Sequence, residues 1–144
     1  MRYTLPEPFE ELDHTGDVGV LVRGRDPEEA LARLVLALAS LMCGGGPVEP
    51  VYEREIEVPP LDYAAMAIQV LREQLVLFAL GREIVAAVEV VRFAPDLGAR
   101  LRVSTGPYDP VAHVEGGEIK AVTLHGASFA QSEDGWVAQV IFDV

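Results

Sequence analysis

Two stretches near opposite ends of the sequence carry side chains that could do chemistry. Residues 12–20 hold two aspartates, a histidine and two glycines among apolar residues. The other stretch is an apolar run that leads into Asp143 and Val144, where a side-chain carboxylate lies next to an α-carboxylate. If the fold brings Asp17 to that end, three carboxylates converge.

Convergent carboxylates predict a cation site. Like charges repel one another, and burial adds a desolvation cost to that repulsion. The usual remedy in proteins is a hard divalent cation with oxygen ligands, such as calcium or magnesium. Asp17, Asp143 and the terminal carboxylate of Val144 are therefore candidate ligands, although an aspartate in a turn and a solvated terminal acid have the same sequence pattern.

The other polar residues of residues 12–20 have more than one interpretation. Asp13 is expected to accept hydrogen bonds from backbone N–H groups or from Thr15, or else to orient a ligand of the ion. His14 could be a general base or a ligand. Because calcium and magnesium prefer oxygen ligands, a histidine that supports the loop through hydrogen bonds is favoured.

The composition narrows the class of protein. The chain has 144 residues, half of them hydrophobic, so a single domain over residues 1–144 is expected. Its formal net charge of -12 argues against direct nucleic-acid binding and is compatible with a basic protein partner or bound cations. One cysteine, and a longest apolar run (residues 34–43) too short for a bilayer, favour a cytoplasmic protein with no membrane span.

Hydrophobic periodicity predicts a chain of strands interrupted by two helices. Strands are expected at residues 9–13, 18–23, 51–58, 84–93, 99–104, 119–131 and 136–142, helices at 26–42 and 62–80, and loops at 1–8 and 105–117. This order predicts an α+β fold in which mainly antiparallel β-sheets pack against two α-helices. A last strand inserted centrally in its sheet would hold the C-terminal acids rigidly.

Local signals mark where these elements begin and end. Asp26 is placed to cap the first helix, with Pro27 at the first helical position and Glu29 where a capping box needs it. The dipeptide at residues 134–135, Asp-Gly, is the strongest hairpin signal in the chain. The side chain of Cys43, at the end of the first helix, is expected to be buried and packed in the core.

Four sequence blocks resemble the archease family. The blocks are Leu-Asp-His-Thr-Gly-Asp-Val-Gly at residues 12–19, Asp-Pro-Glu-Glu-Ala at 26–30, Glu-Ile-Lys-Ala-Val-Thr-Leu-His at 118–125, and the ending Phe-Asp-Val at 142–144. Each block alone is weak, but they occur in the family's order and reach both ends of the chain. The resemblance therefore covers nearly the whole sequence.

The resemblance implies a helper protein that is not itself an enzyme. Archeases promote guanylylation of the RtcB-type tRNA-splicing RNA ligase and allow it repeated turnovers. By this resemblance, Asp17, Asp143 and Val144 bind a divalent ion, with calcium expected and magnesium or manganese as alternatives. Lys120, the only lysine, belongs to the same functional surface. The family fold is α+β, as the element order also predicts.

Two departures from the family pattern concern single positions. The family usually has Ala where Gly16 stands, a small change that should leave Asp17 in place. It commonly has Asp after the late histidine, where this chain has Gly126, which weakens a role for His125. His125 lies in the middle of a predicted strand, in the alternation of Ile119, Ala121 and Thr123, and is expected to be a core or rim histidine. His113, in a predicted loop, is expected to be solvated.

Two other functions are compatible with the sequence. One is a metal-dependent phosphohydrolase that uses Asp17 and Asp143, with Asp13 and His14 beside them, because a metal bound by carboxylates can activate water or clamp a phosphate. The chain offers no obvious phosphate cradle, which counts against this function. The other is a general chaperone-like binding protein, which would need an exposed apolar patch.

Overall fold

The computed structural model describes residues 1–14 and 16–144, with the side chains of all of them except Asp13 and His14. In chain order the elements are β1 (Arg2–Thr4), β2 (Glu10–His14), β3 (Asp17–Gly24), α1 (Pro27–Cys43), β4 (Tyr52–Val58), α2 (Tyr63–Gly81), β5 (Glu83–Ala94), β6 (Gly98–Pro107), β7 (Ala121–Ser132) and β8 (Gly135–Asp143).

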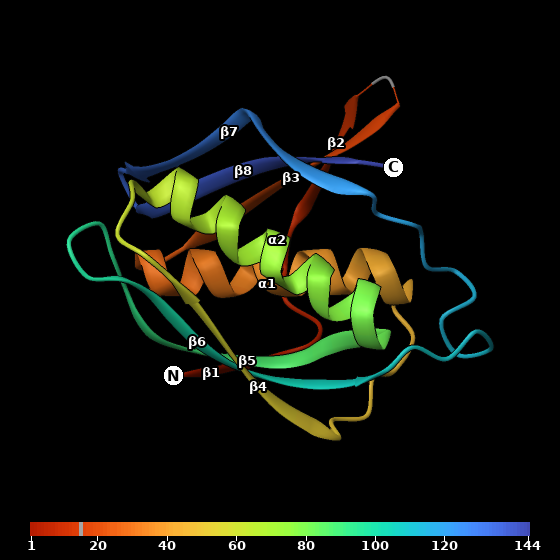
Figure 1. Ribbon diagram of the computed structural model, residues 1–144. Coiled ribbons are helices and arrows are strands. Elements are labelled where there is room, and N and C mark those ends of the chain that lie inside the picture. The colour runs from red at the N-terminus through yellow and green to blue at the C-terminus, as the bar shows by residue number, and fades with distance from the viewer. Residues whose placement is uncertain (15) are drawn as a thin grey trace.

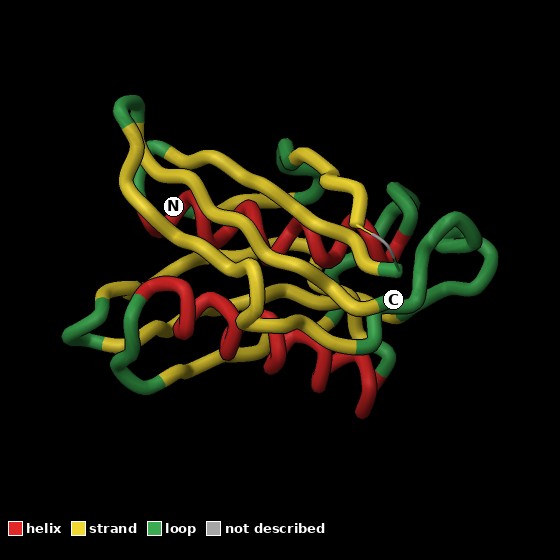
Figure 2. The backbone as a smooth tube through the Cα atoms, turned by 90° about the horizontal axis from the view of Figure 1, so that it is seen from above, coloured by secondary structure: helices red, strands yellow, loops and turns green. Residues whose placement is uncertain are grey.

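The strands form two antiparallel sheets with both helices between them. One sheet has the order β1-β5-β6-β4 and the other the order β2-β3-β8-β7. Helix α1 packs on β5 of one sheet and β3 of the other, and α2 packs on β7 and β5. Figures 1 and 2 show this arrangement of sheet, helices and sheet. The predicted α+β class, with mainly antiparallel sheets and two packed helices, is confirmed.

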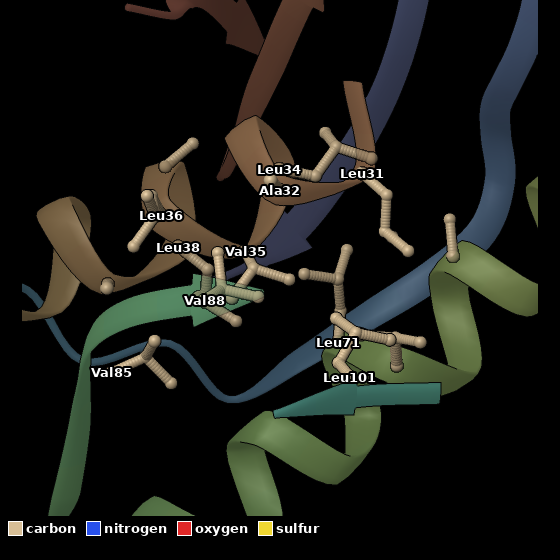
Figure 3. Close-up of a cluster of buried hydrophobic side chains, with 14 of the residues drawn as sticks. Leu31, Ala32, Leu34, Val35, Leu36, Leu38, Leu71, Val85, Val88 and Leu101 are labelled. Carbon is tan, nitrogen blue, oxygen red and sulfur yellow. The ribbon is translucent and has the colours of Figure 1, made fainter. Parts of the chain in front are cut away.

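Helix α1 forms the centre of the core because it is apolar on almost every side. Asp26 caps its start, accepting a hydrogen bond from the backbone N–H of Glu29 at 2.8 Å. Gly44 ends it in the left-handed region, at a φ of 63°. Leucines from both halves of α1 are fully buried and meet side chains of α2, β5 and β6 (Figure 3). Cys43 is buried at its end, as expected.

Helix α2 is less enclosed than α1. Asp62 caps it by accepting from the backbone N–H of Ala65 at 2.8 Å. The predicted stop at Gly81 is one residue early, because the left-handed cap is Arg82, at a φ of 53°. Within the described residues, α2 is the one helix long and apolar enough to cross a membrane by length and composition, a test that core helices also pass.

Several predicted boundaries were wrong, each for a tertiary reason. Residues 2–4, predicted as loop, form β1 because they pair with β5. Strand β6 continues into the predicted loop as far as Pro107, because β5 pairs with it up to Glu83. The last hairpin exists, but Ser132 pairs with Gly135, so residues 133–134 form its turn instead of 134–135.

Candidate functional site

The strand register brings the two predicted acidic ligands together. Strand β8 lies between β3 and β7, so its end is held on both sides. Asp17, the first residue of β3, stands directly opposite Asp143, the last residue of β8. Side chains of directly opposed residues lie on the same face, with Cβ atoms about 4.5–5.5 Å apart. The expected convergence of these two residues is therefore seen at the level of the strand register.

Alternation along the two strands decides which way the acids point. Phe142 and Val140 of β8 are buried against the helices, and Asp143 is exposed. Val20 and Val22 of β3 face the core in the same way. The carboxylates of Asp17 and Asp143 therefore belong to the outer face of their sheet, where a ligand or a partner has access.

Neither acid has a basic partner among the described side chains. No ion pair joins Asp17 or Asp143 to a described Lys or Arg, although directly opposed like charges destabilise a sheet. Gly16, just before Asp17, has a φ of 77°, a left-handed conformation that suits glycine in the turn. Val144 is exposed next to Asp143.

The donor set of this site suits a hard divalent cation. Two side-chain carboxylates and one terminal carboxylate are all oxygen donors, which calcium and magnesium prefer. Within the described part of the chain, no group of three His, Cys, Asp or Glu side chains is close enough to form a metal site by itself. That the α-carboxylate of Val144 supplies a third donor stays a prediction.

The side chains of two other predicted residues, Asp13 and His14, lie outside what is described. The backbone of β2 pairs His14 with Asp17 and Asp13 with Val18, which puts both residues in the strand next to β3. Their side chains fall outside the described residues, so the hydrogen-bonding roles expected for Asp13 and His14, including the one with Thr15, stay predictions.

Lys120 is attached to the acidic end by its backbone. Its N–H donates to the carbonyl of Asp143 at 2.8 Å, just before β7 begins. Ala121 then pairs with Asp143 and so shares the outer face. The side chain of Lys120 lines a groove on the helix side, together with residues of α2. Lys120 and the acids thus border the same strand ends from two sides of the sheet.

His125 is exposed, so of the two expected positions, core or rim, the core position was wrong. The register of β7 jumps between Thr123 and Ser128, and residues 124–127 stand opposite Val140 alone. This bulge breaks the alternation on which the expectation rested, and it turns His125 and Leu124 to solvent. Gly126, at a φ of 75°, allows the bulge to form. A contact of His125 with a partner stays a prediction.

His113 is fully buried, which overturns the expectation of a solvated side chain. Its Nδ1 accepts from the backbone N–H of Asp109 at 2.9 Å, so Nε2 carries the proton and donates to the carbonyl of Pro47 at 2.7 Å. The loop that contains His113 is thereby bonded to the segment after α1. Nothing in the local sequence indicates this, because Pro47 is 66 residues away.

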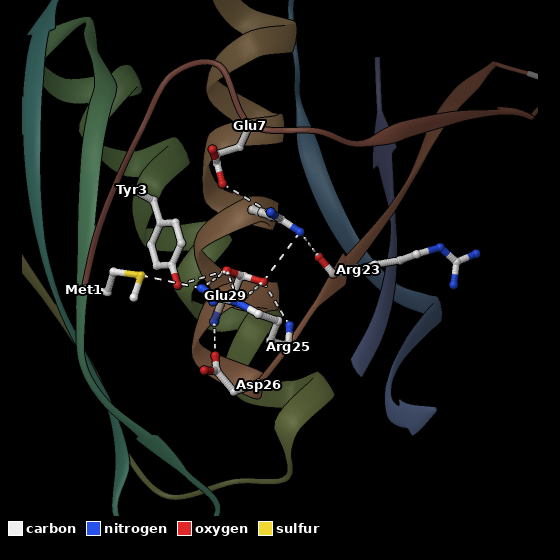
Figure 4. Close-up of polar contacts among 8 residues, drawn as sticks. Met1, Tyr3, Glu7, Arg23, Arg25, Asp26 and Glu29 are labelled. Carbon is white, nitrogen blue, oxygen red and sulfur yellow. Dashed lines mark hydrogen bonds and ion pairs between the residues drawn. The ribbon is translucent and has the colours of Figure 1, made fainter. Parts of the chain in front are cut away.

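Elsewhere, the buried acids have arginine partners. Glu29 accepts from the backbone N–H of Arg25 at 2.9 Å, from the Arg25 guanidinium at 2.9 Å and from the Tyr3 hydroxyl at 3.3 Å, with Arg33 at 3.7 Å (Figure 4). The predicted capping box is wrong, because the Glu29 carboxylate bonds to Arg25 instead of to the N–H of Asp26. Burial raises the pKa of Glu29, but the arginines outweigh it and hold that pKa below its usual value.

A second buried acid, Glu83, is also satisfied. Both of its oxygens accept from the Arg54 guanidinium, at 3.0 and 2.9 Å, and one also accepts from the Thr105 hydroxyl at 2.6 Å. The hydrogen bonds from Arg54 lower the pKa of Glu83 more than burial raises it. Because β4, β5 and β6 each supply one member, this cluster joins three strands of one sheet.

Comparison with known proteins gives a single consistent result. Residues 9–144 match the model of the Archease protein family. The chain is 32% identical to "Protein archease" of Methanopyrus kandleri, over 95% of this chain and 99% of that one, and 32% identical to that of Thermococcus kodakarensis, over 94% and 98%. The solution structure of Methanobacterium thermoautotrophicum protein 1598 is similar, with a TM-score of 0.78, 28% identity, and 94% and 98% of the two chains covered. By sequence and by fold, this chain belongs to the archease family.

Proposed function

We propose that this protein is a metal-binding protein cofactor of an RtcB-type RNA ligase, and is not itself an enzyme. In this proposal it promotes guanylylation of the ligase and allows multiple turnovers in tRNA splicing. The observation that carries the proposal is the opposition of Asp17 and Asp143 at the sheet end, in a chain that belongs to the archease family.

The ion would be held by the side chains of Asp17 and Asp143 and by the α-carboxylate of Val144. Calcium is the favoured ion, and magnesium and manganese are alternatives, because all three accept oxygen ligands. A divalent ion at this place would neutralise the opposed carboxylates and could be presented to a phosphate-bearing site. The side chains themselves hold and orient the ion, and β8, paired on both sides, fixes their position.

The surface charge supports a basic protein as partner. A net charge of -12 favours encounter with the positively charged surface of an RNA-handling enzyme and disfavours competition for the RNA itself. The outward direction of the acidic pair leaves it free to meet such a surface. An intracellular partner of this kind also agrees with the expected cytoplasmic location.

The test is RNA ligation with limiting ligase from the same source, in the presence of manganese and GTP. Turnover beyond one product per ligase is expected only when this protein is added. Asp17→Asn and Asp143→Asn should reduce the stimulation at least tenfold, because each removes one charged oxygen ligand. Asp134→Asn, an exposed turn aspartate far along the same sheet, is the matched control and should stimulate normally.

Two results would contradict the proposal. If an active ligase gave the same number of products with and without this protein, the helper role would fail. If both Asn variants stimulated as well as the wild type, the metal site would be irrelevant to the activity. Metal-dependent hydrolysis of a phosphodiester that Asp143→Asn abolishes would instead favour the alternative of a phosphohydrolase.

A further inference from the structure

A groove of about 910 Å³ runs beside the acidic end on the helix side of the sheet. One wall is the second half of α2, which contributes Val76 and Ala79. The other wall is the segment 116–120, which ends at Lys120. Since the N–H of Lys120 is bonded to the carbonyl of Asp143, the groove begins where the carboxylate site ends.

The α2 side of the groove carries apolar side chains that are partly open to solvent, beside polar groups from the rest of the lining. Val76 is 44% exposed, and Ala79 beside it is also exposed. Phe78 and Ile119, which also line the groove, are half-buried against the core. Exposed apolar side chains with polar groups around them are a feature of sites that bind a partner protein.

The walls are fixed before any partner binds. The N–H of Gly117 donates to the carbonyl of Leu41, and the N–H of Gly116 donates to the carbonyl of His113, both at 2.9 Å. His113 is in turn buried and bonded to Pro47. A Cβ on Gly116 would lie 1.9 Å from the carbonyl oxygen of Met42, so only glycine allows this wall to approach α1 so closely. A preformed groove loses little conformational entropy on binding.

The charge in the groove differs from that of the chain as a whole. Arg82 and Lys120 both line it, and neither is ion-paired with a described acidic side chain. The Arg82 guanidinium lies 5.0 Å from the centre of the Phe78 ring, and Glu118 is the one acid in the lining. Two cations against one acid make this a locally positive groove in a chain of net charge -12.

We infer that this groove binds a segment of the ligase that presents apolar side chains together with a carboxylate. The apolar side chains would cover Val76, Ala79 and Phe78, and the carboxylate would pair with Arg82 or Lys120. This charge pattern, opposite to that of the outer acidic face, would fix the orientation of the complex. The inference rests on the proposed function, since it names how the same partner is held beside the carboxylate site.

The experiment measures the dissociation constant for the ligase and, separately, the stimulation at saturating concentration. Val76→Glu should weaken binding at least tenfold, because it places a charge among the apolar side chains of the α2 wall, and Arg82→Glu should weaken it several-fold. Both variants should stimulate normally once saturating, because the carboxylate pair is intact. Leu97→Glu and Arg72→Glu, which are exposed outside the groove, are the matched controls and should bind as the wild type does.

Ligase peptides give the second measurement. Those that bind this protein should contain Asp or Glu beside apolar residues, and replacing the acid with Lys should abolish binding. If Val76→Glu and Arg82→Glu keep wild-type affinity while Asp17→Asn loses stimulation, the groove inference is overturned and the proposed function stands. If the wild type neither binds nor stimulates the ligase, both the groove inference and the proposed function are wrong. If Val76→Glu changes only self-association in sedimentation, the groove joins two copies and the inference is wrong.

Discussion

The acidic residues of this protein have two different kinds of surroundings. Glu29 and Glu83 are buried, and each has an arginine within 3 Å and at least one further hydrogen-bond donor. Asp17 and Asp143 oppose each other at a sheet end and have no ion pair with a described Lys or Arg. Both pairs of residues occur in the same acidic chain, so the difference in pairing comes from their local surroundings and not from the net charge.

The difference separates acids that hold the fold from acids that are available to a ligand. A buried carboxylate is tolerated only when it is paired and hydrogen-bonded, so removing its partners or itself disturbs the fold. An opposed pair without a cation costs stability and is retained only if something else benefits. The contrast therefore predicts opposite responses to the same chemical change, the removal of one negative charge.

The largest loss of stability is expected when Glu29 is replaced. Glu29→Gln should lower the free energy of unfolding by about 2–3 kcal/mol, because the charge-assisted hydrogen bonds from Arg25 and the ion pair with Arg33 are lost in a buried place. Glu28→Gln is the control, since it removes the same charge from the same helix turn and should cost less than about 1 kcal/mol. Urea denaturation of both variants measures the difference, and equal costs would show that the Glu29 cluster contributes nothing specific.

A somewhat smaller change in the free energy of unfolding is expected when calcium is added. At thirty times its dissociation constant, calcium should stabilise the wild type by about 2 kcal/mol, and chelation should reverse this. Asp17→Asn and Asp143→Asn should lose most of that gain, yet without calcium they should match or exceed wild-type stability by up to about 1 kcal/mol. Asp96→Asn, in an exposed turn, is the control. Calcium-dependent melting curves test this, and a marked loss of stability without calcium would make the acidic pair structural.

The smallest effect concerns acid pH and Glu83. Arg54 holds the pKa of Glu83 below its ordinary value, so this group stabilises the fold above pH about 4.3 and loses its contribution as pH falls through the lowered pKa. Glu83→Gln should therefore cost about 1–2 kcal/mol at pH 7 and progressively less below pH about 4. Unfolding at several pH values measures this. If Glu83→Gln lowered the free energy of unfolding by the same amount at every pH, the loss would be due to packing and not to the charge of Glu83.

Much of the fold could be predicted from the sequence because its signals are local. The cap at Asp26 lies within three residues of the N–H group that it satisfies. The first helix is apolar on most sides, so it has to be enclosed by the rest of the fold. The elements that were missed depend on distant partners. Residues 2–4 form a strand only because they pair with β5. His125 is exposed because the register between β7 and β8 shifts around it.

The candidate site divides in the same way. Its acids were identified from residue type and from resemblance to a family. Whether they meet was left as a condition on the fold, and the register of β3 and β8 places Asp17 opposite Asp143. The groove could not be predicted, because its walls come from α2 and from residues 116–120, and the buried His113 that supports it bonds across 66 residues. A contact between distant segments leaves no periodic signal in either of them.

The sequence by itself determined the helices, most strands, the α+β class and the identity of the acidic residues, because caps, periodicity and charge act over a few positions. Only the tertiary structure decided that β8 lies inside its sheet, that Asp17 meets Asp143 there, and that Lys120 faces a groove on the other side. Those features depend on strand order and register, which follow from the packing of the whole core and not from any one stretch of chain.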